Sequence, residues 1–546
     1  MNSQHDVETS QMGGRRLVEG RSIRWDDVQA ETAYSMGLWV RETLGDSLRA
    51  VAAGDPGRVL VEEGDKRVTA AHLLQRSTQL AGTMLARMAT GSVISFMLPN
   101  WHEAAEIYLA ATLAGMVVNP ILPSLRDHDL AFLLTDSGSR MIFIPETFRG
   151  YSYRAMLERV TDGVDAPPDV VVLRGDAGPH EGYASLFDRI GKHELPQVEP
   201  DAVRMIMYTS GTTGTPKAVL HSHNSLHALI RQIGDHWHIA PGDRFLVPSP
   251  ISHIGGSIYT FETPLLLGSS VILMDHWRAE DALEIMADRH VTHMAGATPF
   301  LEQLLAAARK KAIKLPDLKV FICGGASVPP SLIREAAAYF ENTAVTRAYG
   351  STEVPVTAVG AANRHDIAHA ADTDGKIGIA TVRIAGDGEI LAKGPQMLVG
   401  YLHRDHEAAA FDEEGFYRTG DTGRIIDGDY LVIEGRKKDI IIRMGENIAP
   451  KEIEDLLIQH PAIAEVAIVG LPHPRTGEQA CAVVVAAAED DLQLVDMVSF
   501  LDALGVAKFK FPETLVLWPS LPKNDAGKVL KHRIRERILA EQGPPE

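Results

Sequence analysis

Strands and helices alternate along most of this chain, and the alternation limits the folds that it can adopt. Short apolar runs recur at VISFMLP (93–99), MIFIP (141–145), RFLVPSP (244–250) and KVFICGG (319–325), separated by stretches with helical spacing of apolar side chains. Continuous apolar runs of this length are typical of strands that are buried on both faces of a parallel sheet. We therefore predict an α/β fold in which helices flank parallel-rich sheets.

The texture of the sequence changes toward the C-terminus. From about residue 380, short strands and Gly/Asp turns predominate, as in TVRIAGDGEILAKG (381–394) and GRIIDGDYLVIEG (423–435). After GRKKD, a helix near Pro450, two apolar strands and further helices predict a small α+β unit. Because 546 residues exceed one compact core, we predict a large N-terminal domain over 1–435, which includes the β-rich subdomain, and a small mobile C-terminal domain over 436–546.

Charge and cysteine content restrict the function. Lys and Arg number 53 and Asp and Glu 72, a formal net charge of −19, which argues against a nucleic-acid partner. The N-terminus has no apolar segment like that of a signal peptide, and the run 107–118 is shorter than the ~20 residues of a membrane span. Cys323 and Cys481 form no Cys-x-x-Cys motif. We expect a cytoplasmic monomer or homodimer without integral membrane association.

The run MYTSGTTGTPKAVL (207–220) gives the first functional hypothesis. Hydroxyl side chains and glycines alternate in it, so backbone N–H groups can approach an anion closely while one lysine adds positive charge. We interpret it as a phosphate-binding loop, the alternative being a solvated linker. A Walker loop requires Gly before its lysine and Ser or Thr after it. Pro216 and Ala218 occupy those places, so we expect another class of ATP chemistry.

Four later motifs follow this loop: YGSTE (349–353), YRTGD (417–421), GRKKDIIIRMGENIAPKEIE (435–454) and LPKNDAGKVLK (521–531). Together and in this order they resemble the signature of the adenylate-forming (AMP-binding) superfamily, which includes acyl-CoA synthetases, non-ribosomal adenylation domains and beetle luciferases. The nearest resemblance is to medium-chain and cyclohexanecarboxylate–CoA ligases. One departure is Ala218, where family loops usually have Gly; we expect altered packing there and retained activity.

The resemblance implies an ATP site and a magnesium ligand. The residues that match the ATP-binding positions of the family are Thr209, Ser210, Gly211, Thr212, Thr213, Gly214, Lys217, Gly324, Gly325, Ala326, Tyr349, Gly350, Thr352, Asp421 and Arg436. Asp421 would accept the ribose hydroxyls. Glu353 resembles the Mg²⁺ ligand, a role suited to a carboxylate oxygen.

The resemblance also implies the catalytic groups. Lys528 would bridge the attacking carboxylate and the α-phosphate, with Thr352 as a donor to that phosphate and His253 at the carboxylate end of the acyl site. Lys438 aligns with the hinge of the family, and Gly445 with the strand that admits the pantetheine arm of coenzyme A. Because one lysine cannot serve two half-reactions from one position, the C-terminal domain is expected to rotate between them.

The acyl pocket is expected along PSPISHIGGSIYTF (248–261) and beyond, at His253, Gly255, Gly256, Ile258 and Val354. Its two glycines would leave volume for the substrate. These segments contain no Arg or Lys, so a second carboxylate on the substrate would lack a partner. We therefore predict a monocarboxylic acid with a medium-chain, alicyclic or aromatic body, and coenzyme A as acceptor.

Two other functions remain open at this point: an enzyme that loads a carrier protein, and a non-catalytic nucleotide-binding protein. A further alternative concerns the histidines of HSHNSLHALIRQIGDHWH (221–238), since His223 and His227 have the i, i+4 spacing of some zinc sites. No Glu follows the first of them and no Cys lies nearby. A surface or packed helix is the favoured interpretation.

Overall fold

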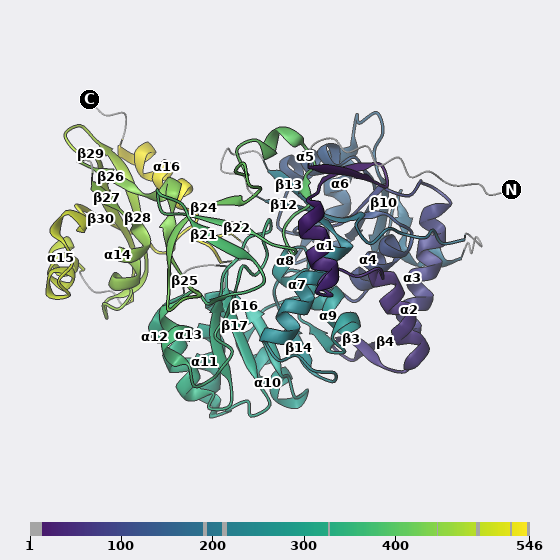
Figure 1. The fold of residues 1–546 in the computed structure, drawn as a ribbon, viewed down its shortest axis with the longest axis horizontal. Coiled ribbons are helices and arrows are strands. Elements are labelled where there is room, and N and C mark those ends of the chain that lie inside the picture. The colour runs from purple at the N-terminus through teal and green to yellow at the C-terminus, as the bar shows by residue number, and fades with distance from the viewer. Residues whose placement is uncertain are drawn as a thin grey trace.

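The computed structural model describes residues 14–188, 194–209, 216–325, 328–444, 446–487, 492–524 and 527–542. It confirms the predicted α/β architecture: two large parallel-rich sheets form the N-terminal part, and two smaller, mainly antiparallel sheets follow (Figure 1).

The first large sheet carries the predicted phosphate loop. Its described strands lie in the order β11 (Glu181–Gly182), β10 (Asp169–Leu173), β7 (Ser139–Pro145), β5 (Val93–Phe96), β6 (Val117–Pro120), β12 (Val203–Thr209), β13 (Lys217–Ser222) and β23 (Gly400–Tyr401). The pairs from β11 to β12 are parallel, whereas β13 is antiparallel to both of its neighbours. The apolar runs at 93–99 and 141–145 therefore form buried strands, as predicted.

The second large sheet contains the other apolar runs. Its described strands lie in the order β18 (Ala344–Ala348), β17 (Val320–Gly324), β16 (His293–Gly296), β14 (Arg244–Val247), β15 (Ser270–Leu273), β3 (Val59–Glu63) and β4 (Lys66–Thr69), and only the β3–β4 pair is antiparallel. Parallel strands end at the same edge of a sheet, so the loops after β17 and β18 lie close together.

Helices cover these sheets. They are α1 (Asp27–Ser35), α2 (Leu44–Gly54), α3 (Ala70–Leu85), α4 (Glu103–Leu113), α5 (Asp127–Ser137), α6 (Tyr153–Thr161), α7 (His223–His236), α8 (Ile254–Ser257), the π-helix η2 (Ile258–Glu262), α9 (Thr263–Leu266), α10 (Ala279–Asp288), α11 (Thr298–Lys311), α12 (Pro330–Tyr339) and α13 (Ile367–Asp372). The apolar stretch that begins at Ile107 is the buried α4, as expected. No helix of the described residues combines the length and apolar character that a membrane span needs.

The two smaller sheets meet at the predicted domain boundary. The third contains β19 (Ala358–Gly360), β20 (Lys376–Ile377), β25 (Tyr430–Arg436), β24 (Tyr417–Ile426), β22 (Glu389–Lys393) and β21 (Thr381–Ile384). The fourth contains β27 (Glu446–Ile448), β26 (Ile441–Arg443), β29 (Gly477–Ala486), β28 (Ile463–His473) and β30 (Thr514–Leu517), with helices α14 (Pro450–Leu457), α15 (Leu494–Ala503) and α16 (Lys531–Gln542). The chain leaves the third sheet at Arg436 and enters the fourth at Ile441.

The final helix, α16, starts at Lys531, three residues after Lys528. Gly527 has a φ of +76°, a left-handed conformation that interrupts a helix, and Val529 forms a short antiparallel bridge with Lys523. Lys528 is thus held on a turn between two short paired segments. The basic residues of α16 do form an outer helix face, where Lys531 pairs with Glu454 and Arg535 with Glu478.

Candidate active site

The predicted phosphate loop connects two paired strands of the first sheet. Thr209 at the end of β12 lies opposite Lys217 at the start of β13. The Lys217 ammonium lies 5.8 Å from the ring centroid of Tyr401. The loop residues Ser210, Gly211, Thr212, Thr213 and Gly214 lie outside the described residues. Ala218 is buried among apolar neighbours of the first sheet, so its methyl group serves packing there.

Three of the predicted nucleotide-binding residues meet at one carboxylate. Asp421 and Arg436 are opposite each other in the β24–β25 register, with Arg436 Nε 3.1 Å from Asp421 Oδ1. The Tyr349 hydroxyl donates to Asp421 Oδ2 at 2.6 Å. Burial, and then Asp421, raise the pKa of Tyr349 well above its usual value, so it stays a neutral donor. The carboxylate of Asp421 is thus oriented from two sides.

Glu353 is nearly buried and anchored by a tyrosine that the sequence motifs did not single out. The Tyr401 hydroxyl donates to Glu353 Oε1 at 3.1 Å. Burial is the main cause that raises the pKa of Tyr401, so its proton remains available for this bond. Mg²⁺ prefers oxygen ligands, and a ligating carboxylate is often oriented by a hydrogen bond from a neighbouring side chain. Glu353, held by the Tyr401 hydroxyl, fits this pattern.

The backbone around Thr352 is held by a histidine from β13. His221 Nε2 lies 2.7 Å from the Thr352 carbonyl oxygen, and since a carbonyl only accepts, Nε2 carries the proton. Burial lowers the pKa of His221 to about 4, so the ring is neutral. Ser351 Oγ also accepts from the Val354 N–H at 3.2 Å. His221 thus positions the YGSTE segment. In the histidine-rich helix α7 itself, His223 is buried and His227 Nδ1 lies 2.9 Å from the Leu38 carbonyl oxygen, so the helix is packed.

Lys528 reaches the N-terminal part of the molecule. The backbone N–H of Lys528 donates to Asn524 Oδ1 at 2.8 Å. A Cβ at Gly527 would lie 3.5 Å from Pro299 Cγ and 3.8 Å from Ala297 Cβ, so this turn contacts the start of α11. Burial, and then the charge of Arg436, lower the pKa of Lys528 to about 8. The structure thus brings Lys528 close to the Asp421–Arg436 pair.

The loops after β17 and β18 contain four of the other predicted residues. A Cβ at Gly324 would lie 2.7 Å from the Ala348 carbonyl oxygen, so only glycine permits this close approach. Gly350 packs against the backbone of Val356 in the same way. Gly325 has a φ of +83° and faces open space, and Ala326 lies outside the described residues.

The two residues assigned to domain motion lie beyond β25. Lys438 occupies a short 3₁₀ turn, Lys437–Asp439, between the third and fourth sheets. Gly445 lies outside the described residues.

The predicted acyl segment forms a continuous helical run, α8–η2–α9. His253 caps its start, where Nδ1 accepts from the Gly255 N–H at 3.3 Å, and surrounding protein lowers the pKa of the imidazole. The sequence predicts that both glycines leave volume for the substrate, but they differ in what surrounds them. A Cβ at Gly256 would collide with the Pro250 carbonyl oxygen, so Gly256 serves close packing, whereas a Cβ at Gly255 would meet only His253 Nδ1 at 3.6 Å.

The apolar residues of the predicted pocket do not all lie together. Ile258 opens the π-helix and packs in the main core. Val354 packs in a different cluster, with Val219, Leu398 and Tyr401. Val356, two residues later, packs against the core that contains Ile258. Val356 has a φ of +47°, which is strained for a β-branched residue and has no signal in the sequence.

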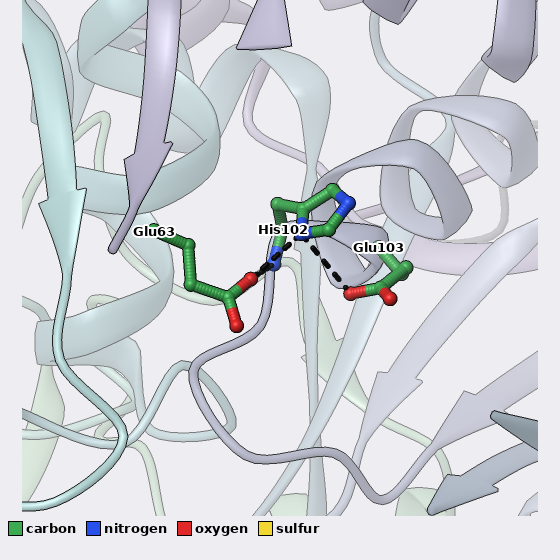
Figure 2. Close-up of side chains that lie close together, drawn as sticks. All are labelled: Glu63, His102 and Glu103. Carbon is green, nitrogen blue, oxygen red and sulfur yellow. Dashed lines mark hydrogen bonds and ion pairs between the residues drawn. The ribbon is translucent and has the colours of Figure 1, made fainter. Parts of the chain in front are cut away.

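One side-chain group outside this site has the spacing of a metal centre. Among the described residues, Glu63, His102 and Glu103 place ligand atoms within 4.8 Å of one another (Figure 2). Arg174 binds both carboxylates: its two Nη atoms lie 2.7 Å from Glu63, and Nη2 lies 2.7 Å from Glu103 Oε2. The carboxylates are therefore paired by a guanidinium, and the group is an ion-pair network.

Comparison with known proteins identifies the family. The model of the AMP-binding enzyme family matches residues 48–402, and that of the AMP-binding enzyme C-terminal domain matches 452–528. The chain belongs to the AMP-binding enzyme family. It is an enzyme of the ligase class, the AMP-forming acyl-CoA synthetases. It is 32% identical over 532 residues to the medium-chain fatty-acid–CoA ligase of Escherichia coli K12, covering 94% of this chain and 93% of that protein.

Solved structures agree on the fold. ATP-bound MatB from Rhodopseudomonas palustris is 26% identical, with a TM-score of 0.82 over 91% of this chain and 99% of that one. The apo form of MatB covers the same shares of the two chains with a TM-score of 0.72.

Proposed function

We propose that this protein activates a hydrophobic monocarboxylic acid of medium-chain, alicyclic or aromatic type with ATP and Mg²⁺, and then transfers the acyl group to coenzyme A. In the first half-reaction the carboxylate attacks the α-phosphate, pyrophosphate leaves and an acyl-AMP forms. In the second, the thiol of coenzyme A displaces AMP. The observation that carries the proposal is the convergence of Tyr349, Asp421, Arg436 and Lys528, from both domains, at one place.

The roles follow from the chemistry of these groups. Asp421, already oriented by two donors, would accept the ribose hydroxyls. Thr209 and Lys217, with the loop between them, would hold the leaving pyrophosphate. Thr352 would donate to the α-phosphate, and Lys528 would offset the negative charge that gathers between carboxylate and phosphate in the transition state. Glu353 would hold Mg²⁺, which when bound neutralises phosphate charge.

The acid itself is proposed from the acyl segment. His253 would lie at the carboxylate end, and Gly255 would border the space for the acyl body, with Ile258 and Val356 as apolar walls. The E. coli relative is named for medium-chain fatty acids, which agrees with an apolar pocket. Exchange of pyrophosphate into ATP, measured over a panel of apolar, aromatic and dicarboxylic acids, tests this proposal. Exchange with none of them would contradict it, and exchange with dicarboxylates alone would contradict the apolar pocket.

The two half-reactions can be separated with one variant. Lys528→Ala should abolish acid-dependent exchange but spare thioester formation from supplied acyl-AMP and coenzyme A, since Lys528 acts only on the first step. Equal loss of both would contradict the domain-rotation account. Thioester formation with free coenzyme A, compared with a pantetheinylated carrier protein, separates a CoA ligase from a carrier-loading enzyme.

A further inference from the structure

A cavity lies between the start of α2, β12, α7 and the end of η2. Its volume is about 220 Å³, well above the share of about 30 Å³ that one water takes in the liquid. Part of its wall is apolar, formed by Val40, Leu44 and Leu266. The remainder includes the exposed Glu42 and two charged side chains that are almost fully buried, which is unusual for a cavity wall and points to a ligand.

The charged wall is built from Arg204 of β12 and Glu262 of η2, each only 1% exposed. Arg204 Nη2 lies 2.9 Å from Glu262 Oε1, and the Tyr108 hydroxyl donates to the same oxygen at 2.8 Å. Among the described residues, Arg204 Nε and Glu262 Oε2 have no hydrogen-bond partner, and Arg204 Nη2 has only its ion-pair contact with Glu262 Oε1. A buried polar group without a partner is unfavourable, more so when it is charged. The wall therefore offers an unpaired donor beside an unpaired acceptor.

A third unpaired group belongs to the same wall. His223 of α7 lines the cavity, and its Nδ1 has no partner among the described residues. Burial lowers the pKa of His223 well below its usual value, so the ring is neutral. It adds a hydrogen-bonding group but no charge.

The ligand chemistry follows from this donor and acceptor set. A guanidinium only donates and a carboxylate only accepts, whereas a hydroxyl group can accept from Arg204 and donate to Glu262 at once. Because the charges of Arg204 and Glu262 cancel and Glu42 adds a further carboxylate to the wall, a second carboxylate on the substrate would enter as an uncompensated charge. The cavity therefore favours a neutral oxygen on an apolar body.

The cavity shares a helical run with the proposed acyl site. Glu262 and Leu266, which line the cavity, lie on the α8–η2–α9 run that His253 caps, and Ile258 on this run packs in the same core cluster as Leu44. Nine residues separate His253 from Glu262, which at about 1.5 Å per residue gives roughly 13 Å. That distance corresponds to an extended chain of roughly ten single bonds.

We propose that this cavity is the far end of the acyl site and binds a hydroxyl or other neutral oxygen at the distal end of a medium-length acid. The proposal rests on the proposed function, since it extends the acyl site. Arg204 and Glu262 then determine specificity: together they select an oxygenated terminus and disfavour a purely apolar one of the same length.

The test compares matched acids with the wild-type protein. The kcat/KM for acid-dependent pyrophosphate exchange is measured for decanoate and its ω-hydroxy derivative, and for hexanoate and its ω-hydroxy derivative. The hydroxylated acid should be favoured by about 10- to 100-fold in the decanoate pair, because the unpaired groups are satisfied only by it. The hexanoate pair should show no such preference, since the shorter chain cannot reach the cavity.

A paired substitution locates the effect. Arg204→Met alone would leave Glu262 as an unpaired buried charge, so the variant of choice is Arg204→Met/Glu262→Met, because exchange of a whole buried ion pair for apolar residues is often tolerated. In this variant the ratio of efficiencies within the decanoate pair should fall to about one. Thermal unfolding reports whether it folds, and the chain-length comparison in the wild type does not depend on it.

Three outcomes would overturn the inference. Equal efficiencies within the wild-type decanoate pair would assign the cavity to water alone. The same preference for the ω-hydroxy acid in the decanoate and hexanoate pairs, or an unchanged preference in a folded double variant, would show that the cavity does not cause it. Each leaves the proposed function intact, because apolar acids would still support exchange. Absence of exchange with every acid would instead contradict the proposed function itself.

Discussion

At the scale of single residues, the lowered pKa of Lys528 has a direct kinetic consequence. The ammonium form is the one that can stabilise negative charge, and it predominates below the pKa of about 8. The kcat/KM for ATP in pyrophosphate exchange should therefore fall as pH rises through about 8. Lys528→Arg, whose guanidinium stays charged, should be slower but should lose this alkaline decline. The same decline in both proteins would assign the titration to another group.

Tyr401 is a second residue whose contribution can be isolated. Its hydroxyl is the described donor to Glu353 Oε1. Removal of such an outer-layer donor typically weakens metal binding by about 10- to 100-fold, so Tyr401→Phe should raise the Mg²⁺ concentration for half-maximal exchange by that factor. Tyr339→Phe is the matched control, since the hydroxyl of Tyr339 donates to the Ala308 carbonyl on α11, away from the Glu353–Tyr401 contact. An unchanged Mg²⁺ dependence in Tyr401→Phe would contradict this positioning role.

At the scale of elements, the two adjacent glycines of α8 make opposite predictions. Gly256→Ala places a methyl group against the carbonyl of Pro250, and such overpacking costs about 1–3 kcal/mol, so the thermal midpoint should fall. Gly255→Ala meets no backbone and should unfold like the wild type. If Gly255 borders the acyl space, the kcat/KM of the Gly255→Ala variant should fall about tenfold more for bulky acids than for small ones. Equal behaviour of both variants would contradict this division.

The elements also show where sequence reasoning succeeds and where it ends. The strands at 93–96, 141–145 and 320–324 and the buried α4 follow from local apolar periodicity, which a single sequence contains. Local periodicity does not reveal the roles of the donors His221, Tyr401 and Arg204. Their partners lie 131, 48 and 58 residues away along the chain. The left-handed conformation of Val356 is a further example, because no local pattern specifies a positive φ for valine.

At the scale of the whole molecule, the net charge is negative, whereas the candidate ATP site contains several positive side chains. The chain carries a net charge of −19, yet Lys217, Arg436 and Lys528 stand among the residues proposed to bind ATP. An overall negative field does not attract a nucleotide, so local cations must hold it. Because Lys528 comes from the C-terminal domain and Lys217 from the first sheet, this local positive charge is complete only in a domain arrangement that, as here, brings the Lys528 turn against the start of α11.

This arrangement can be locked to test whether the domains must rotate. A Cβ at Gly527 would lie 3.8 Å from Ala297 Cβ, which is the mean Cβ separation of about 3.8 Å across a disulfide. The variant Ala297→Cys/Gly527→Cys should therefore cross-link on oxidation. Because the buried Cys323 lies opposite Gly296 in the β16–β17 register, the variant is made in a Cys323→Ala background. The oxidised protein should keep acid-dependent pyrophosphate exchange but lose thioester formation with coenzyme A, and reduction should restore it.

The single variants Ala297→Cys and Gly527→Cys control for the substitutions themselves, including the strain of a side chain at the left-handed position 527. Full thioester formation by the oxidised, cross-linked protein would mean that both half-reactions proceed from one domain arrangement. Lys528 would then have to act beside the incoming thiol, and the proposed division of labour between the two positions of the C-terminal domain would be wrong.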